Sequence, residues 1–182
     1  LELISPFQQS FTVYADIPVA RRWSVDAGAG AILDSWEWAA YKNETYQGFR
    51  LRTGIKYYMY QTENMNISIG LALKYSQIVN ERYVTVSRQG GQYNEWLLGR
   101  RRVKTSGASI YFASQQFMGP RKRFFVEPFV GLGVRHHEVT REDLPPDAEI
   151  AFPFFRIFNL ELDQGTHKTP DMLLGCYLGW RF

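Results

Sequence analysis

The sequence predicts an all-β protein: one domain, residues 1–182, folded as an eight-stranded antiparallel up-and-down transmembrane β-barrel. Three observations predict this class. Apolar and polar residues alternate at period two along most of the chain. No run of about 18 apolar residues could form a membrane-spanning helix. The composition is 16% aromatic although the mean hydropathy is −0.30, which suits strands in which every second residue is apolar.

Each predicted strand has one apolar face and one small, polar or charged face. In the clearest of them, residues 48–60, Leu51 and Ile55 share the apolar face. Arg52 and Lys56 share the other face. The strands are predicted at residues 10–17, 23–36, 48–60, 66–78, 103–117, 124–139 and 172–182.

The connections set the predicted topology. Short connections at residues 19–22, 61–65 and 118–123 alternate with long ones at residues 37–47, 79–102 and 140–169. Outer-membrane barrels have short periplasmic turns and long external loops. The direction of the strands then requires one outward-running strand before residue 10. We expect Leu1–Ile4 to be the remnant of that strand and Ser5–Gln9 to be the first external loop.

The last predicted strand carries an apolar face that ends on two aromatic residues. Met172, Leu174 and Leu178 share this face with Trp180 and Phe182. Trp180 and Phe182 resemble the C-terminal signal by which outer-membrane barrels are recognised and inserted. We therefore expect these two residues to act as an insertion signal.

Charged residues of both signs fall on the faces that would line the barrel. An eight-stranded barrel has an interior just wide enough for side chains to fill. Unpaired charges there would be costly, whereas paired charges can be accommodated. We therefore expect an ion-pair network that plugs the interior, formed by Asp16, Asp26, Arg50, Arg52, Lys56, Lys74, Glu127 and Arg135.

Aromatic residues near the strand ends are expected to form the girdles of a membrane barrel. They are Trp23, Tyr57, Tyr75, Phe117 and Trp180. The competing fold is a soluble barrel of the lipocalin or streptavidin kind, which has the same alternation with the apolar face inside. The alternating loop lengths, the terminal aromatic residue and the glycine-rich polar face favour the membrane barrel.

The chain resembles small outer-membrane barrels such as OmpA and OmpX, and more closely a group of short Bacteroidetes outer-membrane barrels of unknown function. The resemblance is carried by Ala20–Gly28, Gly107–Tyr111 and Arg123–Gly133, in which a basic turn enters an aromatic residue and then a glycine-alternating strand. It implies a fold and a location in the outer membrane of a Gram-negative bacterium. It carries over no catalytic residue.

Two loop segments are candidate contact sites. The last long loop is strongly apolar, and an exposed patch of this kind marks a contact surface or a lid over the barrel mouth. Its candidate partner-binding residues are Phe152, Phe154, Phe155, Ile157 and Phe158. The third long loop ends in Arg100, Arg101 and Arg102, which could contact lipopolysaccharide phosphates or form a solvated loop base.

Catalytic and metal-binding patterns are weak. His136, His137 and His167 are the three histidines, and adjacent strand residues such as His136 and His137 point to opposite faces. His136 and Glu138 share the outward face, but no serine two residues from a histidine completes a deacylase pattern. A net charge of +3 is too small to indicate nucleic-acid binding. We expect no enzyme activity, cofactor, metal or nucleic-acid partner.

The sequence thus favours a non-enzymatic accessory or structural subunit of a larger outer-membrane complex for protein insertion, secretion or nutrient uptake. Its expected partners are outer-membrane lipid, lipopolysaccharide and a larger outer-membrane protein. The alternatives are an enzyme that modifies lipid A, and a free-standing adhesin or membrane-stabilising barrel.

Overall fold

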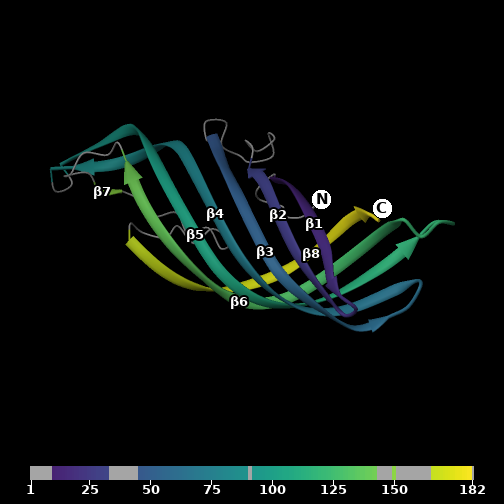
Figure 1. The fold of residues 1–182 in the computed structure, drawn as a ribbon. Helices are drawn as coiled ribbons and strands as arrows, with labels where there is room; N and C mark the ends of the chain where they lie inside the picture. The colour runs from purple at the N-terminus through teal and green to yellow at the C-terminus, as the bar shows by residue number, and fades with distance from the viewer. Residues whose placement is uncertain (1–9, 33–44, 90–91, 143–148, 151–164, 182) are drawn as a thin grey trace.

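The protein is a single curved antiparallel sheet, and the computed structural model describes residues 10–32, 45–89, 92–142, 149–150 and 165–181 (Figure 1). No helix in the described ranges is long and apolar enough to cross a membrane. The strands are β1 (Ser10–Ala20), β2 (Trp23–Ile32), β3 (Thr45–Gln61), β4 (Met65–Arg88), β5 (Tyr93–Met118), β6 (Phe124–Glu142), β7 (Glu149–Ile150) and β8 (Gly165–Trp180).

The strands follow one another up and down, in the order β1-β2-β3-β4-β5-β6-β8. The expected all-β, eight-stranded antiparallel class is confirmed. The eighth strand differs from the expected one, because β7 lies within residues 140–169 and pairs with the far end of β4. Leu1–Ile4 and Ser5–Gln9 lie outside the described residues.

The three short connections are confirmed, and they lie at one end of the sheet. The turn between β3 and β4 is closed by Thr62, whose hydroxyl accepts a hydrogen bond from the Met65 amide at 3.0 Å. The turn between β5 and β6 places Gly119 at φ 81° and Lys122 at φ 50°. This left-handed backbone is readily adopted by glycine, and it lets β5 reverse within five residues.

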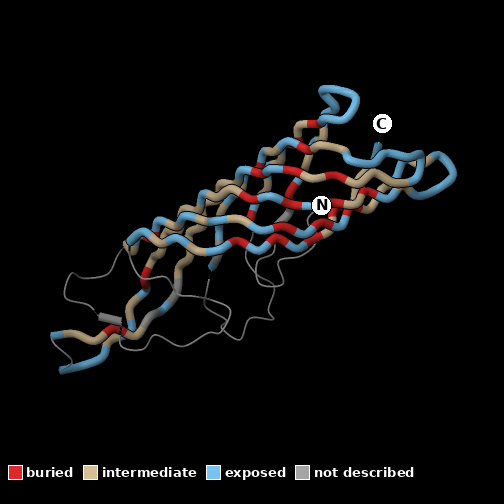
Figure 2. Tube along the Cα trace, turned by 90° about the horizontal axis from the view of Figure 1, so that it is seen from below, coloured by how far each residue is buried: buried red, intermediate tan, exposed pale blue. Residues whose placement is uncertain are grey.

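The expected long loop at residues 79–102 is wrong. β4 and β5 instead continue as a regular hairpin until Arg88 pairs with Tyr93. This hairpin extends beyond the rest of the sheet (Figures 1 and 2). Cross-strand ion pairs such as Arg100–Glu81 accommodate its charged residues in the strands. Similarly, β6 continues to Glu142 and β8 begins at Gly165, earlier than the predicted residue 172.

The sheet curls so that its first and last strands approach each other. The ring centroids of Tyr14 on β1 and Tyr177 on β8 are 4.7 Å apart. Within the described residues, no ladder of hydrogen bonds joins β1 to β8. These two strands run in the same direction because six antiparallel steps separate them. An antiparallel closure therefore needs one further strand between them.

The concave face, called the inner face below, holds the buried residues. Tyr111 on β5 is fully buried, and Phe129 on β6 and Tyr177 on β8 pack beside it. Phe117 also shares this face. It lies six residues after Tyr111 on β5, an even number, and its ring centroid is 6.1 Å from that of Phe125. The expectation that Phe117 faces outward is therefore wrong. Trp23 and Tyr57 do lie on the outer face near their strand ends, and their ring centroids are 4.9 Å apart.

Candidate functional site

The centre of the inner face is a buried lysine between two carboxylates. Lys56 on β3 extends to Glu127 on β6, with 2.8 Å between Nζ and Oε1. The same Nζ lies 2.9 Å from Oδ2 of Asp16 on β1. Tyr58 donates a hydrogen bond to that Asp16 oxygen at 3.2 Å. Three strands that are distant in the sheet are thus joined across the interior.

A second group of charges meets on Asp171 of β8, whose side chain is fully buried. Lys74 on β4 donates to Oδ2 at 2.9 Å, and Arg135 on β6 forms an ion pair with Oδ1. Beside this group, His137 is held between the hydroxyls of Thr105 and Thr169, at 3.0 and 2.9 Å. One carboxylate therefore balances two cations from different strands.

A third group surrounds the Arg52 guanidinium on β3. Its Nε lies 3.5 Å from Oδ2 of Asp26, and it donates a hydrogen bond to the Tyr177 hydroxyl. The guanidinium carbon also lies over four rings, at 4.7 Å from the centroid of Tyr111 and at 5.4–5.7 Å from the others. These contacts are cation–π interactions. The other rings are those of Tyr14, Phe129 and Tyr177.

Glycines on neighbouring strands make room for these rings. A Cβ built on Gly28 would collide with Tyr14, and one on Gly70 would collide with Tyr111. Gly175 is covered by Phe129 in the same way. The small residues of the polar face therefore serve to admit large side chains, and the rings and charges together fill the interior.

The structure brings together seven of the eight residues predicted for the interior network in ion pairs: Asp16, Asp26, Arg52, Lys56, Lys74, Glu127 and Arg135. Arg50, the eighth, lies on β3 between Gly30 and Ser76. Sequence reasoning missed the rings around Arg52. The available signal was the presence of large rings on the polar faces, at Tyr14, Tyr111 and Tyr177.

The convex face, called the outer face, is apolar over most of its height. Large aliphatic side chains lie exposed on β1, β3, β4, β5, β6 and β8, with Leu132 of β6 70% exposed and Leu174 of β8 74% exposed. Other members are Val13, Ile17, Leu51, Ile55, Leu71, Leu73, Ile110, Phe112, Val130, Val134 and Met172. We call this set the apolar belt. The polarity of the two faces is thus the inverse of that of a soluble barrel with an apolar interior.

Charged residues on the outer face begin where the apolar belt ends. Arg100 pairs with Glu81 at 3.2 Å, and Arg102 pairs with Glu142 at 3.2 Å. Lys104 lies 3.6 Å from Glu138. These three pairs form an ion-pair ladder across β4, β5 and β6. Arg101 alternates to the opposite face, so the three candidate arginines do not form one cluster.

Above the ion-pair ladder, the projecting hairpin carries a small apolar patch that sequence reasoning missed. Tyr83 lies directly opposite Leu98, and Trp96 lies opposite Thr85. Trp96 is 74% exposed. Aromatic and β-branched residues such as Tyr83 and Thr85 occupy every second position here, and this pattern indicates a strand. Charged residues beside them made the pattern hard to recognise.

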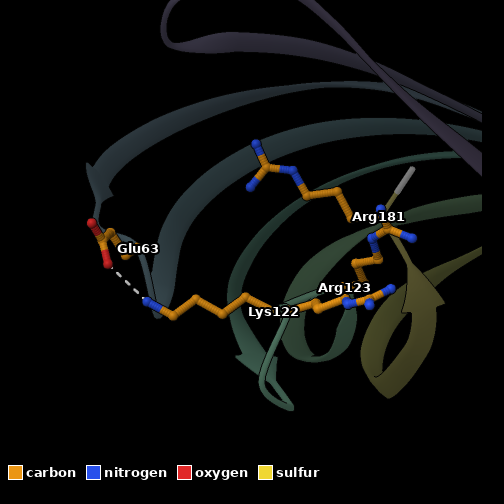
Figure 3. A pocket seen from close by; sticks show the side chains of 5 residues that line it. Glu63, Lys122, Arg123 and Arg181 are labelled. Carbon is orange, nitrogen blue, oxygen red and sulfur yellow. Dashed lines mark hydrogen bonds and ion pairs between the residues drawn. The ribbon is translucent and has the colours of Figure 1, made fainter.

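The end of the sheet with the short turns is basic. A shallow hollow there is lined by Glu63, Arg121, Lys122, Arg123 and Arg181 (Figure 3). Lys122 extends to Glu63, and its Nζ donates to the carboxylate at 2.8 Å. This hydrogen bond and the lysine charge lower the pKa of Glu63, which lies in water.

The catalytic candidates are not joined into a reacting group. Ser106 lies directly opposite His136 on the outer face. No hydrogen bond between these two side chains is found in the described part, and Glu138 pairs with Lys104 instead. Among the described residues, no three His, Cys, Asp or Glu side chains gather as metal ligands.

Of the remaining predicted site residues, the structure describes Trp180. Trp180 lies exposed on the outer face at the end of β8. Phe182 and the loop residues Phe152, Phe154, Phe155, Ile157 and Phe158 lie outside the described residues.

The chain matches no protein-family model, no curated protein and no solved structure.

Proposed function

We propose that this protein is a β-barrel of the bacterial outer membrane that has a filled, non-conducting interior and acts as an accessory or structural subunit of a larger membrane complex. The observation that carries the proposal is the inverted polarity of the sheet. Leu132 and Leu174 are open on the outer face, whereas Lys56 and Glu127 are buried on the inner face. In a bilayer, the apolar belt meets lipid and the paired charges are shielded from it.

The size of the apolar belt supports a membrane location. Soluble monomers rarely expose a contiguous apolar patch larger than a few hundred Å². The belt has members on β1, β3, β4, β5, β6 and β8, and the exposed alanines Ala27, Ala29 and Ala31 continue it on β2. The ion-pair ladder marks its upper limit on β4, β5 and β6. A lipid slab would account for both the continuity of the belt and the level at which charges begin.

The projecting hairpin supports the role of a subunit. Its patch of Tyr83, Trp96 and Leu98 lies beyond the ion-pair ladder and therefore above the slab. Lipid tails cannot cover it there. Exposed aromatic residues of this kind are typical of protein interfaces, so we assign the hairpin to contact with a larger outer-membrane protein.

The experiment is extraction of the tagged protein from its native membrane in mild detergent, followed by mass spectrometry. We expect a large partner in stoichiometric amount, and we expect Trp96→Ser with Leu98→Ser to release it. Ser114→Ala, which changes a different part of β5, is the control and should retain it. A lone 21.2 kDa barrel would contradict the subunit role.

A second candidate function is acyl-ester hydrolysis on a membrane lipid, favoured by the register that sets Ser106 opposite His136. Serine would be the nucleophile and histidine the base. The test is the mass of lipid A after overexpression. Loss of acyl chains that is abolished by Ser106→Ala and by His136→Ala would support this function, and an unchanged mass would exclude it.

A further inference from the structure

The end of the sheet with the short turns holds more positive charge than the whole chain does. The chain has 21 Lys and Arg against 18 Asp and Glu, a net charge of +3. The turn residues and the residue after β8 contribute six cations and one carboxylate, which is +5, so the remainder of the chain is −2. This set, called the basic rim, consists of Arg21, Arg22, Glu63, Arg121, Lys122, Arg123 and Arg181.

Part of the basic rim forms a shaped hollow. Lys122 crosses it to reach Glu63, while Arg123 and Arg181 lie on its other side (Figure 3). The backbone holds these two arginines together, because the Arg181 amide donates to the Arg123 carbonyl at 2.6 Å. The Arg181 guanidinium is also held 5.5 Å from the centre of the Phe117 ring. Arg123 and Arg181 are therefore neighbours along one side of the hollow.

The carboxylate in the hollow neutralises one of its four cations. Glu63 is engaged by Lys122 at 2.8 Å. Among the described residues, no carboxylate forms an ion pair with Arg121, Arg123 or Arg181. Three guanidinium groups at one rim favour an anion that accepts several hydrogen bonds at once, and phosphate has the geometry for paired contacts with arginine.

The position of the basic rim indicates which phosphate it would meet. At three strand ends, a basic residue adjoins an exposed aromatic residue of the outer face: Arg22 with Trp23, Arg123 with Phe124, and Arg181 with Trp180. Aromatic residues collect at the membrane–water boundary. Cations one residue beyond them lie at the depth of lipid headgroups, where long basic side chains reach the phosphates.

We propose that the hollow formed by Arg121, Arg123 and Arg181 binds the phosphate groups of anionic phospholipids in the leaflet next to the short turns. This inference rests on the proposed membrane location. It adds a lipid class and a binding site to that proposal. The site would fix the depth of the barrel at this leaflet and favour anionic over zwitterionic lipid.

The test compares two triple variants that remove the same charge from opposite ends of the sheet. Arg121→Gln/Arg123→Gln/Arg181→Gln empties the hollow and leaves the Lys122–Glu63 pair in place. Arg100→Gln/Arg102→Gln/Lys104→Gln alters the ion-pair ladder and is the control. Native mass spectrometry of each protein, in micelles with equal phosphatidylglycerol and phosphatidylcholine, measures which lipid remains bound.

We expect the wild-type protein and the control to retain phosphatidylglycerol preferentially. Each cation near an anionic surface strengthens binding roughly fivefold. In the hollow variant, the ratio of bound phosphatidylglycerol to bound phosphatidylcholine should therefore fall by at least about tenfold. An unchanged preference, or an equal loss in the control, would overturn the inference. Displacement of the lipid by excess inorganic phosphate alone would show a free-anion site and would overturn the lipid assignment.

A separate arm distinguishes this inference from the proposed location. Each protein is first inserted into vesicles of phosphatidylcholine alone, and protection of its strands from protease is measured. Failure of the wild-type protein to insert would contradict the membrane proposal itself. Insertion without any preference for phosphatidylglycerol would overturn the lipid site and leave the membrane proposal standing.

Discussion

Lys56 shows how single residues stabilise this fold. The residue is 3% exposed, and its ammonium lies within 2.9 Å of two carboxylates, those of Asp16 on β1 and Glu127 on β6. A buried ion pair is weak evidence for net stability, but removing one partner leaves the other charge buried and uncompensated. Lys56 therefore controls whether Glu127 can remain in the interior.

Lys56→Met should destabilise the folded protein by about 3–5 kcal/mol, because Glu127 loses its counter-charge in a buried site. Lys104→Met is the matched control and should cost less than about 1 kcal/mol, because its pair with Glu138 is exposed. Urea unfolding in detergent micelles measures both. Equal effects of the two substitutions would mean that the interior charges are not shielded from water.

At the scale of elements, each long strand combines two environments along its outer face. β5 carries Ile110 and Phe112 in the apolar belt and Arg100 and Arg102 in the ion-pair ladder. The outward side chains of β5 are therefore apolar in one half of the strand and charged in the other.

Leu132→Arg and Leu98→Arg test this division. Both leucines are exposed on the outer face, at 70% and 50%. In a bilayer, an arginine in the middle of the belt should cost about 2–4 kcal/mol, whereas one on the hairpin should change stability by about 0.5 kcal/mol or less. Unfolding in phospholipid vesicles gives both values. Two small, similar effects would contradict the assignment of the belt to lipid.

The sequence predicted the faces of the strands well because period-two alternation depends on local geometry alone. It placed Arg52, Lys56 and Glu127 inside correctly. It did not predict the ends of β4 and β5, because charged residues take the place of apolar ones at alternate outward positions there. Glu81 and Arg100 read as loop residues, yet they pair across the hairpin.

The sequence also did not predict which charged residues pair with each other across the interior. Lys74 and Asp171 are 97 residues apart and meet because β4 and β8 face each other in the curled sheet. Alternation shows that both side chains point inward, but the curl and stagger of the strands decide which residues meet. For the same reason, the rings around Arg52 became visible only in three dimensions.

For the whole molecule, the central consequence is a filled interior. The Arg52 and Lys56 groups, the Asp171 group and the rings between them link β1, β3, β4, β6 and β8 across the inner face. An eight-stranded barrel has room for side chains and little else. The protein should therefore hold its shape through its interior and should not serve as a channel.

Planar-bilayer recordings test the filled interior. The wild-type protein should give no stepwise conductance at neutral pH, since ion pairs of Arg52, Lys56 and Asp171 cross the interior. Arg52→Ala with Tyr177→Ala, which removes the central guanidinium and one of its rings, should introduce leak currents. Stable ohmic steps from the wild-type protein would contradict a plugged interior.

The central claim is that the outer face meets lipid while the inner face does not. The direct measurement is spin-label accessibility along β6 in reconstituted vesicles, using single cysteines at positions 130, 132, 134, 135 and 137 after Cys176→Ala removes the one native thiol. The account predicts that labels at Val130, Leu132 and Val134 collide with oxygen dissolved in the lipid and avoid a water-soluble relaxant, whereas labels at Arg135 and His137 meet little of either. Ready access of the water-soluble relaxant to position 132 would contradict it.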